Sequence, residues 1–299
     1  MHNDRTTTIA TLFVVGTGCL WGFYWLPVRR LSDLGLSGAW GTLAIVLVTT
    51  LLLIPFAWRT RQRSAHSSAQ ALAWVALGGF AFVLYSAGLV YGRVAIVILL
   101  FFLTPVWSTL IGRYVMGWPT PWLRLGAIVV GLAGLGFVLG ADGELPFPRG
   151  LGDWLGLASG LLWAIATTGI RFRPAVQPGR SAFVFALGAS IGAAALAPML
   201  EPLPSLSAGS IAPALAWTLF TGSVWWGLSV ACLMWAAARL EPARVGILLM
   251  TEVLVGLVSA AVIAGELLRP LEVAGGALVL FAGVLEVWPM GRSRPRSAA

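Results

Sequence analysis

Aromatic and hydroxyl side chains recur one helical turn apart in several strongly apolar stretches. Residues four apart share one face of an α-helix. Three stretches place a Trp one turn from a hydroxyl, with Tyr24 beside the first: Thr17, Trp21 and Trp25; Ser159, Trp163 and Thr167; Thr221, Trp225 and Ser229. Indole rings offer flat apolar contact and a polar N–H, and hydroxyls can bind a carboxylate or an ammonium. The pattern predicts a cavity for an amino acid with an apolar side chain.

Two further stretches carry similar groups, namely Phe101, Thr104, Trp107 and Ser108 in one, and Tyr85 beside Phe82 and Ser86 in the other. Taken singly, a Trp in such a stretch packs against a neighbour or lipid more often than it binds a ligand, and a Trp near the end of a stretch suits the interfacial belt. The expected cavity residues are Trp21, Tyr24, Tyr85, Phe101, Thr104, Trp107, Trp163, Thr167, Trp225, Ser229 and Glu252.

Glu252 is the one ionisable residue deep inside an apolar stretch, seven residues beyond Val245 and twelve before Ala264. A charge at mid-bilayer costs about 2.5–3.5 kcal/mol on insertion scales, so such residues usually face a cavity or a partner. The carboxyl could accept a substrate ammonium or exchange protons. It could equally be a protonated or hydrogen-bonded group that pins two helices together, and the sequence leaves both interpretations open.

The composition places these stretches in lipid. Of the 299 residues, 59% are hydrophobic and 10% are charged, whereas an ordinary soluble domain carries about 25% charged residues. A soluble fold needs a polar surface that this chain cannot supply, so the apolar excess must face a lipid bilayer. The formal charge of +8 comes from arginines spread over short gaps between apolar stretches. Because these arginines form no clustered patch, they argue against nucleic-acid binding.

A membrane-spanning helix needs about 20 mostly apolar residues. The sequence predicts an all-α polytopic membrane protein with ten such helices, called spans and numbered in chain order: Ile9–Val28, Gly38–Trp58, Gln70–Val90, Val94–Met116, Trp122–Leu139, Trp154–Ile170, Ser181–Leu200, Ala212–Ala236, Val245–Ala264 and Leu271–Trp288. The gaps are too short for a soluble domain. The first span has no small-residue cleavage pattern, so we interpret it as a retained helix rather than a signal peptide.

The arginines are unequally shared between the two sides of the membrane. If the amino terminus lies inside, the inner segments hold fourteen of the nineteen basic residues and the outer segments hold five, namely Arg29, Arg30, Arg93, Arg149 and Arg269. The positive-inside rule then predicts a bacterial inner-membrane protein with both termini in the cytoplasm. A missed or extra span would scramble this alternation, so the bias also supports the number of spans.

The chain also repeats itself. GCLWGFYWLP from Gly18 resembles GLLWAIATTG from Gly160, and LTPVWSTL around Pro105 resembles MTEVLVGL around Val253. GAIVVGLAG from Gly126 matches GGALVLFAG from Gly275 at its first and last glycines. These offsets give each half five spans, and an odd number of spans turns the halves upside down relative to each other. We expect repeats at residues 1–145 and 150–290, then a basic cytoplasmic tail at 291–299.

Inverted repeats are typical of secondary transporters, which bind substrate between the halves near the membrane midplane. Glycines recur every fourth residue within several spans, which favours close approach of helix backbones in lipid. The glycines with this spacing are Gly152, Gly156 and Gly160; Gly188 and Gly192; and Gly136 and Gly140.

Other chemistries find little support. Cys19 and Cys232 lie inside apolar stretches with no partner at metal or redox spacing, and His2 and His66 lie in the tail and a polar gap. We therefore expect no metal, no cofactor and no enzymatic activity. No Gly-rich phosphate loop with Lys is present, so ATP bound to this chain would not drive transport. A monomer would suffice, and the oligomeric state stays open.

Ten spans in two halves, each closing with a Gly-rich span, resemble the drug/metabolite transporter superfamily and its EamA-type members. Halves of that type carry E-P-V and, about a dozen residues later, G-E. Glu252, Gly265 and Glu266 match in the second half, and Pro105 and Gly117 match in the first. Three positions depart from the pattern: Val253 stands in place of proline, and Thr104 and Trp118 in place of the glutamates.

The Trp-rich first span, CLWGFYWLPVR, resembles the aromatic amino acid exporter branch of that family. The resemblance implies export of aromatic and other neutral amino acids by alternating access. The alternatives are an exporter of another small metabolite or drug, and, from a different class, a non-transporting membrane enzyme or receptor.

Overall fold

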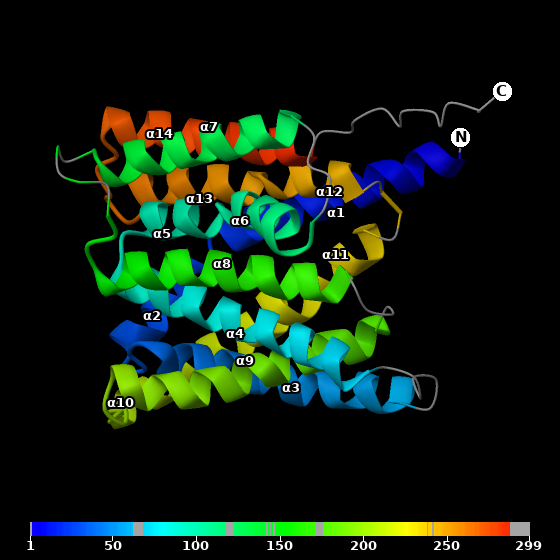
Figure 1. The fold of residues 1–299 in the computed structure, drawn as a ribbon. Coiled ribbons are helices and arrows are strands. Elements are labelled where there is room, and N and C mark those ends of the chain that lie inside the picture. Colours follow the sequence, from blue (N-terminus) through cyan, green and yellow to red (C-terminus); the bar gives the residue numbers. More distant parts are fainter. Residues whose placement is uncertain are drawn as a thin grey trace.

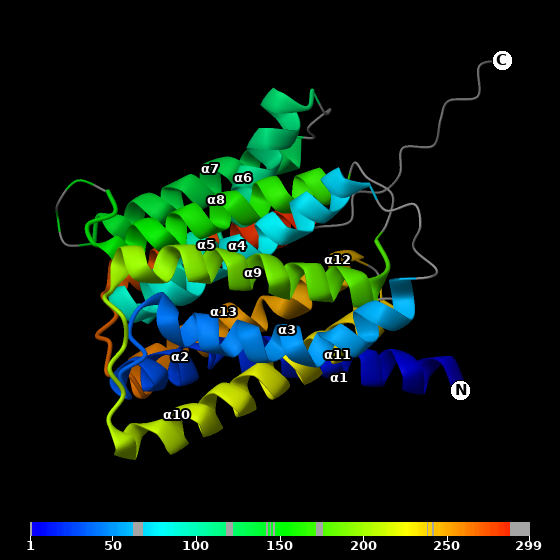
Figure 2. The same ribbon diagram turned by 90° about the horizontal axis from the view of Figure 1, so that it is seen from below.

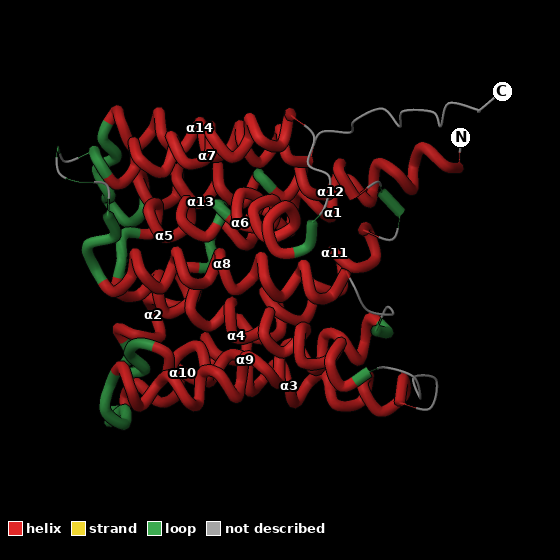
Figure 3. The backbone as a smooth tube through the Cα atoms, viewed as in Figure 1, coloured by secondary structure: helices red, strands yellow, loops and turns green. Residues whose placement is uncertain are grey.

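The computed structural model describes residues 2–61, 68–117, 122–141, 143, 145, 147–171, 176–237, 239–240 and 242–287. Throughout these ranges the regular structure is helical, and no strand occurs in them. The helices lie side by side along one common direction, and their connections gather at two opposite ends (Figure 1, Figure 3). The predicted all-α class is therefore confirmed, while the predicted tail at 291–299 and Trp288 lie outside the described residues.

The helices follow one another without large insertions. The first half comprises α1 (His2–Gly22), α2 (Trp25–Asp33), α3 (Ala39–Arg61), α4 (Ala69–Tyr91), α5 (Val94–Phe101), α6 (Thr104–Leu110), the π-helical η1 (Ile111–Val115) and α7 (Trp122–Leu139). The second half comprises α8 (Leu151–Arg171), α9 (Pro178–Leu200), α10 (Ala208–Thr221), the π-helical η2 (Gly222–Leu228), α11 (Ser229–Ala237), α12 (Pro242–Leu249), α13 (Thr251–Val262) and α14 (Pro270–Val287).

Within the described residues, eight helical segments are long and apolar enough to cross a membrane: Arg5–Asp33, Ala39–Trp58, Ala69–Tyr91, Val94–Val115, Trp122–Leu139, Gly179–Leu200, Ala208–Leu233 and Arg244–Val262. The predicted sixth and tenth spans correspond to α8 and α14. Both are helical, but neither combines the length and the apolarity of the eight segments above. Helix α8 carries Asp153 in its first turn and Arg171 in its last. The apolar part of α14, Pro270–Leu285, is shorter than the others.

Two spans are interrupted where a proline removes a helical hydrogen bond. Pro27 cannot donate to the Phe23 carbonyl four residues earlier, and the helix breaks between α1 and α2 at that point. Pro105 likewise leaves the Phe101 carbonyl without its helical donor, and α5 ends at Phe101. The Thr104 hydroxyl donates to that carbonyl instead, at 2.7 Å. The predicted first and fourth spans are thus each two helices in sequence.

The ninth span breaks at Met250 without any proline. The Thr251 hydroxyl donates to the Leu248 carbonyl at 2.8 Å, which replaces a backbone bond at the break. The eighth span contains η2, where the hydrogen bonds connect residues five apart instead of four. None of these irregularities follows from the apolar composition, because apolarity determines where a helix lies but not how its carbonyls are satisfied.

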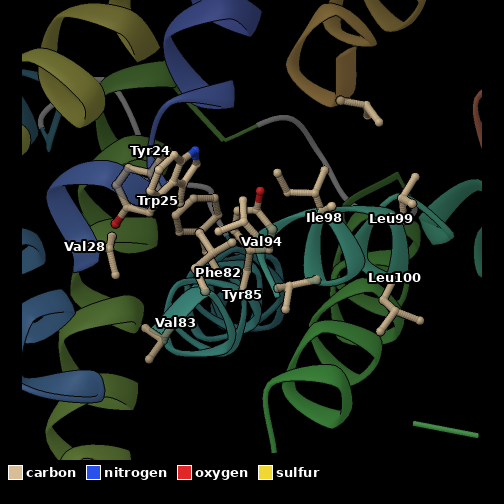
Figure 4. Packing of buried hydrophobic residues seen from close by; sticks show 14 of the residues in the cluster. Tyr24, Trp25, Val28, Phe82, Val83, Tyr85, Val94, Ile98, Leu99 and Leu100 are labelled. Atoms are coloured by element: carbon tan, nitrogen blue, oxygen red, sulfur yellow. The ribbon is translucent and has the colours of Figure 1, made fainter. Parts of the chain in front are cut away.

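The helices pack in pairs from opposite halves of the chain. Helix α7 lies against α14, α4 against α8 and α9, and α3 against α9. Helix α1 lies against α11, α12 and α13, and α8 against α5 and α6. Figure 2 shows α10 at the edge of the molecule farthest from α7. The largest buried cluster extends through most of the helices, and Figure 4 shows the part of it that α2, α4 and α5 contribute around Tyr24, Phe82 and Tyr85.

Glycines set several of these close approaches. A Cβ at Gly160 would lie 2.7 Å from the Phe101 carbonyl oxygen of α5, and one at Gly156 would lie 3.2 Å from the Val97 Cα. A Cβ at Gly188 or Gly192 would clash with Ala76 or Phe80 of α4. Close packing at these predicted positions is confirmed. Gly136 differs, because a Cβ there would meet no atom within 4 Å.

Charged side chains connect the two halves of the chain at the end of the bundle that lies opposite the start of α1. Arg29 reaches Glu266 at 3.3 Å and the carbonyl of Gly92 at 2.8 Å. Glu266 also accepts from the backbone N–H of Val94 at 2.7 Å, at the start of α5. Arg93 binds the Glu272 carboxylate through its two terminal guanidinium nitrogens, Nη1 and Nη2. We call Arg29, Arg93, Glu266 and Glu272 the charged clamp.

Candidate functional site

A continuous set of aromatic rings occupies the interior of the bundle. Phe82 of α4 stands at its centre, with ring centroids 4.9 Å from both Trp21 and Trp226 and 5.4 Å from Tyr85. Edge and tilted contacts of this kind contribute about 0.5–1.5 kcal/mol per pair beyond area burial. The rings that contact one another, which we call the aromatic cluster, are Trp21, Tyr24, Phe82, Tyr85, Phe101, Phe102, Trp163, Phe185 and Trp226.

The aromatic cluster joins the two halves of the chain. Tyr85 stacks on Phe101 at 4.6 Å, and Phe101 lies 6.5 Å from Trp163 of α8. Trp163 contacts Phe185 of α9 at 5.9 Å, and Phe185 contacts Trp226 at 5.6 Å. The rings therefore form a path from α1 and α4 through α5 into α8, α9 and η2. Any relative movement of the halves must change contacts within this path.

Members of the aromatic cluster differ in burial. Tyr24, Tyr85 and Trp226 are buried, whereas Trp21, at the end of α1, and Trp163, in the middle of α8, remain half-buried. Phe101 and Phe185 are also half-buried. The half-buried rings are those with surface available for contact with a ligand, and the buried ones form the support behind them.

Tyr24 belongs to that support. Its hydroxyl lies 3.3 Å from the Ser86 hydroxyl, which in turn lies 2.6 Å from the Thr42 hydroxyl. The indole N–H of Trp226 donates to Tyr24 at 3.4 Å. Figure 4 shows the Tyr24 ring beside Trp25 and above Phe82, with its oxygen toward Val28. The Tyr24 hydroxyl is therefore fully engaged, and it orients three helices rather than being free for a substrate.

The indoles of Trp21 and Trp225 make different contacts. Trp21 donates to the Ser229 hydroxyl at 3.0 Å, so α1 and α11 are joined. Trp225 is buried and donates to the Leu20 carbonyl at 2.8 Å, which also accepts from the Phe23 backbone N–H at 3.1 Å in the break after α1. Its ring contacts Phe220 at 5.5 Å instead of the aromatic cluster. Trp226, the next residue, takes the inward position.

The predicted threonines hydrogen-bond to the backbone. Thr104 donates to the carbonyls of Phe101 at 2.7 Å and Gly160 at 3.2 Å. Thr167 donates to the Trp163 carbonyl at 2.8 Å. The indole N–H of Trp107 is buried and has no hydrogen-bond partner among the described residues. Because the Thr104 and Thr167 hydroxyls already donate to backbone carbonyls, neither is free to donate to a substrate carboxylate.

Glu252 and Tyr85 bring a carboxyl and a phenolic hydroxyl to the site. Glu252 lies in the first turn of α13, directly after the break at Met250, and is half-buried. The Tyr85 hydroxyl is the polar group that acts electrostatically on this carboxyl. Yet Tyr85, which is 1% exposed, makes no hydrogen bond of acceptable geometry with any described residue. A buried hydroxyl in this state costs free energy unless a ligand or water completes it.

Five of the predicted cavity residues come together in the aromatic cluster, namely Trp21, Tyr24, Tyr85, Phe101 and Trp163. Two more lie next to members of the cluster: Glu252 lies beside Tyr85, and Ser229 accepts a hydrogen bond from Trp21. Trp107 and Trp225 contact none of the rings of the aromatic cluster, and Thr104 and Thr167 hydrogen-bond to the backbone instead. Phe82, Phe185 and Trp226 were missed as site residues. Phe82 and Phe185 both had a signal, since Phe82 stands one turn before Ser86 and Phe185 stands one turn after Ser181.

In the described part of the chain, no group of three or more His, Cys, Asp or Glu residues lies close enough together to hold a metal ion. Cys19 and Cys232 are free thiols. What the site can offer is therefore one carboxyl, one open hydroxyl and aromatic faces.

Comparisons with known proteins agree with this architecture. Residues 8–140 match the EamA-like transporter family. No curated protein matches the sequence significantly. A solved structure, titled only as the crystal structure of a protein, covers 92% of this chain and 97% of its own with a TM-score of 0.56 and 18% identity, which shows a common fold. Within the described residues, several helices are long and apolar enough to cross a membrane, as in a multi-pass membrane protein, and residues 8–140 are similar to the EamA-like transporter family.

Proposed function

We propose that the protein is a secondary transporter that exports aromatic and other neutral amino acids across the bacterial inner membrane by alternating access. The observation that carries the proposal is the aromatic cluster, because its rings come from both halves of the chain and adjoin a mid-span carboxyl. Flat rings suit apolar side chains of varied shape. Carboxyl and hydroxyl groups suit the polar part of an amino acid.

The proposal includes ten spans in two inverted repeats, residues 1–145 and 150–290. Paired positions support the repeat. Gly18 and Gly160, matched in sequence, both lie against the break of a span in the other half: a Cβ at Gly18 would clash with Thr251, and one at Gly160 would lie 2.7 Å from the Phe101 oxygen. Thr104 and Thr251 each donate to the carbonyl three residues earlier.

The ends of the fourth and ninth spans support the repeat as well. Gly117 and Gly265 adopt positive φ angles of 68° and 67°, a conformation that favours glycine. The pairing of helices is also unchanged when the halves are exchanged, since α1 lies against α13 as α8 lies against α5. Such symmetry would let the aromatic cluster open first to one side of the membrane and then to the other.

The side that faces the cytoplasm is inferred from the arginines. Helix α1 begins and α14 ends at the same end of the bundle, opposite the charged clamp (Figure 1). With the termini inside, the arginine-rich connections face the cytoplasm, as the positive-inside rule requires. The charged clamp would then close the periplasmic side.

Flux through reconstituted protein tests the proposal. Proteoliposomes should take up radiolabelled phenylalanine, tryptophan or leucine faster than empty liposomes. Uptake of a different metabolite or drug, with none of any amino acid, would move the assignment to the alternative substrate class. Equal rates with and without protein for all of these compounds would contradict transport and favour a membrane enzyme or receptor.

A further inference from the structure

We infer that the site recognises its substrate through an ammonium group, with Glu252 as the counter-charge, and that a substrate carboxylate contributes little to binding. The inference rests on the proposed function, because it takes the aromatic cluster as the substrate site. It goes further by ranking compounds that share one aromatic ring and differ only in charge.

Glu252 is fixed in place by its backbone. Helix α1 lies directly against it, because a Cβ at Gly18 would lie 3.3 Å from the Glu252 nitrogen and one at Gly22 would lie 2.8 Å from the Glu252 carbonyl oxygen. The break at Met250 makes Glu252 part of a helix N-terminus, where the helix dipole favours a negative charge. The carboxyl is thus held at one depth in the bundle, and it can still be reached because it is half-buried.

No described basic side chain compensates this carboxyl. Its polar neighbour is the Tyr85 hydroxyl. The ion pairs between described residues engage two other glutamates, Glu266 and Glu272, at the charged clamp. On the side of α1 toward the termini, Arg244 of α12 binds Thr11 at 3.0 Å. An unpaired carboxylate in the apolar interior is costly, so it requires a proton or a bound cation.

The surroundings of Glu252 favour an organic cation. The Tyr85 ring packs against Phe101 and Phe82, so aromatic rings lie behind the hydroxyl that neighbours the carboxyl. An ammonium near such rings is attracted by their negative faces, most strongly when it is desolvated. It also has three N–H donors, which can bind the carboxylate and the unpartnered Tyr85 oxygen together. In Figure 4 the Tyr85 oxygen points into the space between Trp25 and Ile98, away from Val83.

A substrate carboxylate finds no equivalent partner. The hydroxyls of Tyr24, Thr104 and Thr167 are engaged in the hydrogen bonds described above. The arginines of the charged clamp are bound to glutamates. A carboxylate near Glu252 would also be repelled by it. Among the described residues of the aromatic cluster, the site therefore offers a carboxyl for an ammonium and rings for an apolar group, but no cationic side chain for an acid.

Three compounds with the same phenyl ring separate these contributions: phenethylamine, L-phenylalanine and 3-phenylpropionate. Their affinities can be measured by isothermal titration calorimetry on the detergent-solubilised full chain. We expect phenethylamine and phenylalanine to bind within a few-fold of each other and 3-phenylpropionate at least about tenfold more weakly, because a charge-assisted bond is worth about 1.5–3 kcal/mol. Equal affinity for phenylalanine and 3-phenylpropionate, or no binding of either amine, would overturn the inference.

Variants locate the effect. Glu252→Gln keeps the shape of the side chain and should weaken both amines about tenfold or more, while 3-phenylpropionate should lose nothing. Tyr85→Phe removes an unpartnered hydroxyl, so it should weaken amine binding without lowering the melting temperature. Glu266→Gln is the matched control, a carboxyl of the charged clamp that should leave the ranking unchanged. Unaltered amine affinity in well-folded Glu252→Gln would refute the assignment.

Transport and recognition can fail separately. If the ranking holds in calorimetry and proteoliposomes show no flux, the proposed function fails and the ammonium site stands. If phenylalanine is transported while 3-phenylpropionate binds as well as phenethylamine, the transporter stands and the ammonium inference is wrong.

Discussion

Trp163 lies between rings of both halves, 6.5 Å from Phe101 and 5.9 Å from Phe185, and it keeps exposed ring surface. Replacing it with alanine removes aromatic contact area from the site. The substitution breaks no hydrogen bond between the indole and another described residue. We expect Trp163→Ala to reduce amino acid uptake in proteoliposomes about two- to tenfold, equivalent to the loss of one or two aromatic contacts.

The matched control for this variant is Trp154→Ala on the same helix. Trp154 is 53% exposed and lies near the start of α8, away from the aromatic cluster. Its loss should leave uptake unchanged. Undiminished uptake by a correctly folded Trp163→Ala protein would remove Trp163 from the substrate site.

Other residues show what could be anticipated one side chain at a time. Glu252 could be singled out because a carboxyl among apolar residues is conspicuous in the sequence. The free hydroxyl of Tyr85 could not, since Tyr24 has the same side chain and uses its hydroxyl for two hydrogen bonds. Whether a hydroxyl is engaged depends on neighbours from other helices, which composition does not reveal.

At the scale of helices, the contact between α4 and α9 depends on a glycine. A Cβ at Gly79 would clash with the Phe185 carbonyl oxygen and lie 2.7 Å from the Ala189 nitrogen. Both are backbone atoms, which cannot move without shifting a helix. We expect Gly79→Ala to destabilise the protein by about 1–3 kcal/mol, measured by denaturant unfolding in detergent.

Gly136→Ala provides the comparison, since a Cβ there meets nothing within 4 Å. Alanine also has the higher helix propensity, so its stability should be equal or slightly higher. Similar destabilisation by both substitutions would show that the cost comes from the loss of glycine itself and not from the α4–α9 contact.

The charged clamp holds the connections between helices at one end. Arg29 and Arg30 are adjacent, yet Arg29 binds Glu266 and two carbonyls while Arg30 is exposed. We expect Arg29→Gln to lower the free energy of unfolding by about 1.5–3 kcal/mol, the value of hydrogen bonds to a charged group. Arg30→Gln should change it by less than about 0.5 kcal/mol.

Loss of the charged clamp should also loosen its end of the bundle. Spin labels at Leu203 and Leu267, which are 80% and 89% exposed, would report this by pulsed electron resonance with Cys19 and Cys232 replaced. In the Arg29→Gln variant, a second population of molecules should appear in which the two spin labels are farther apart than in the parent protein. An identical distance distribution in Arg29→Gln and the parent would show that the charged clamp does not control opening.

At the scale of the whole molecule, the inverted architecture predicts where the chain ends lie. Single cysteines introduced near the amino terminus, at Thr7, and in the tail, at Ser297, should react with a membrane-impermeant maleimide only in inside-out vesicles. A cysteine at Leu267 should react only from the opposite side. Labelling of Thr7→Cys and Ser297→Cys from different sides would contradict two five-helix halves of opposite orientation.

The sequence by itself determined the helical membrane class, the positions of the helices and the glycines of α8 and α9 at which backbones meet. Apolarity and residue spacing are local properties, and lipid requires each backbone to satisfy its hydrogen bonds within its own helix. The glycine pattern was informative for the same reason, although Gly136 shows that spacing alone does not ensure contact.

Only the tertiary structure decided which side chains meet. A period of four residues predicted that Trp225 faces inward, but the wider turns of η2 bring Trp226 to the aromatic cluster instead. Phe185 joins the cluster because Gly79 lets α9 approach α4. Such contacts depend on helix crossings and on breaks in the hydrogen-bond pattern, so they are settled by packing between distant segments and not by the local sequence.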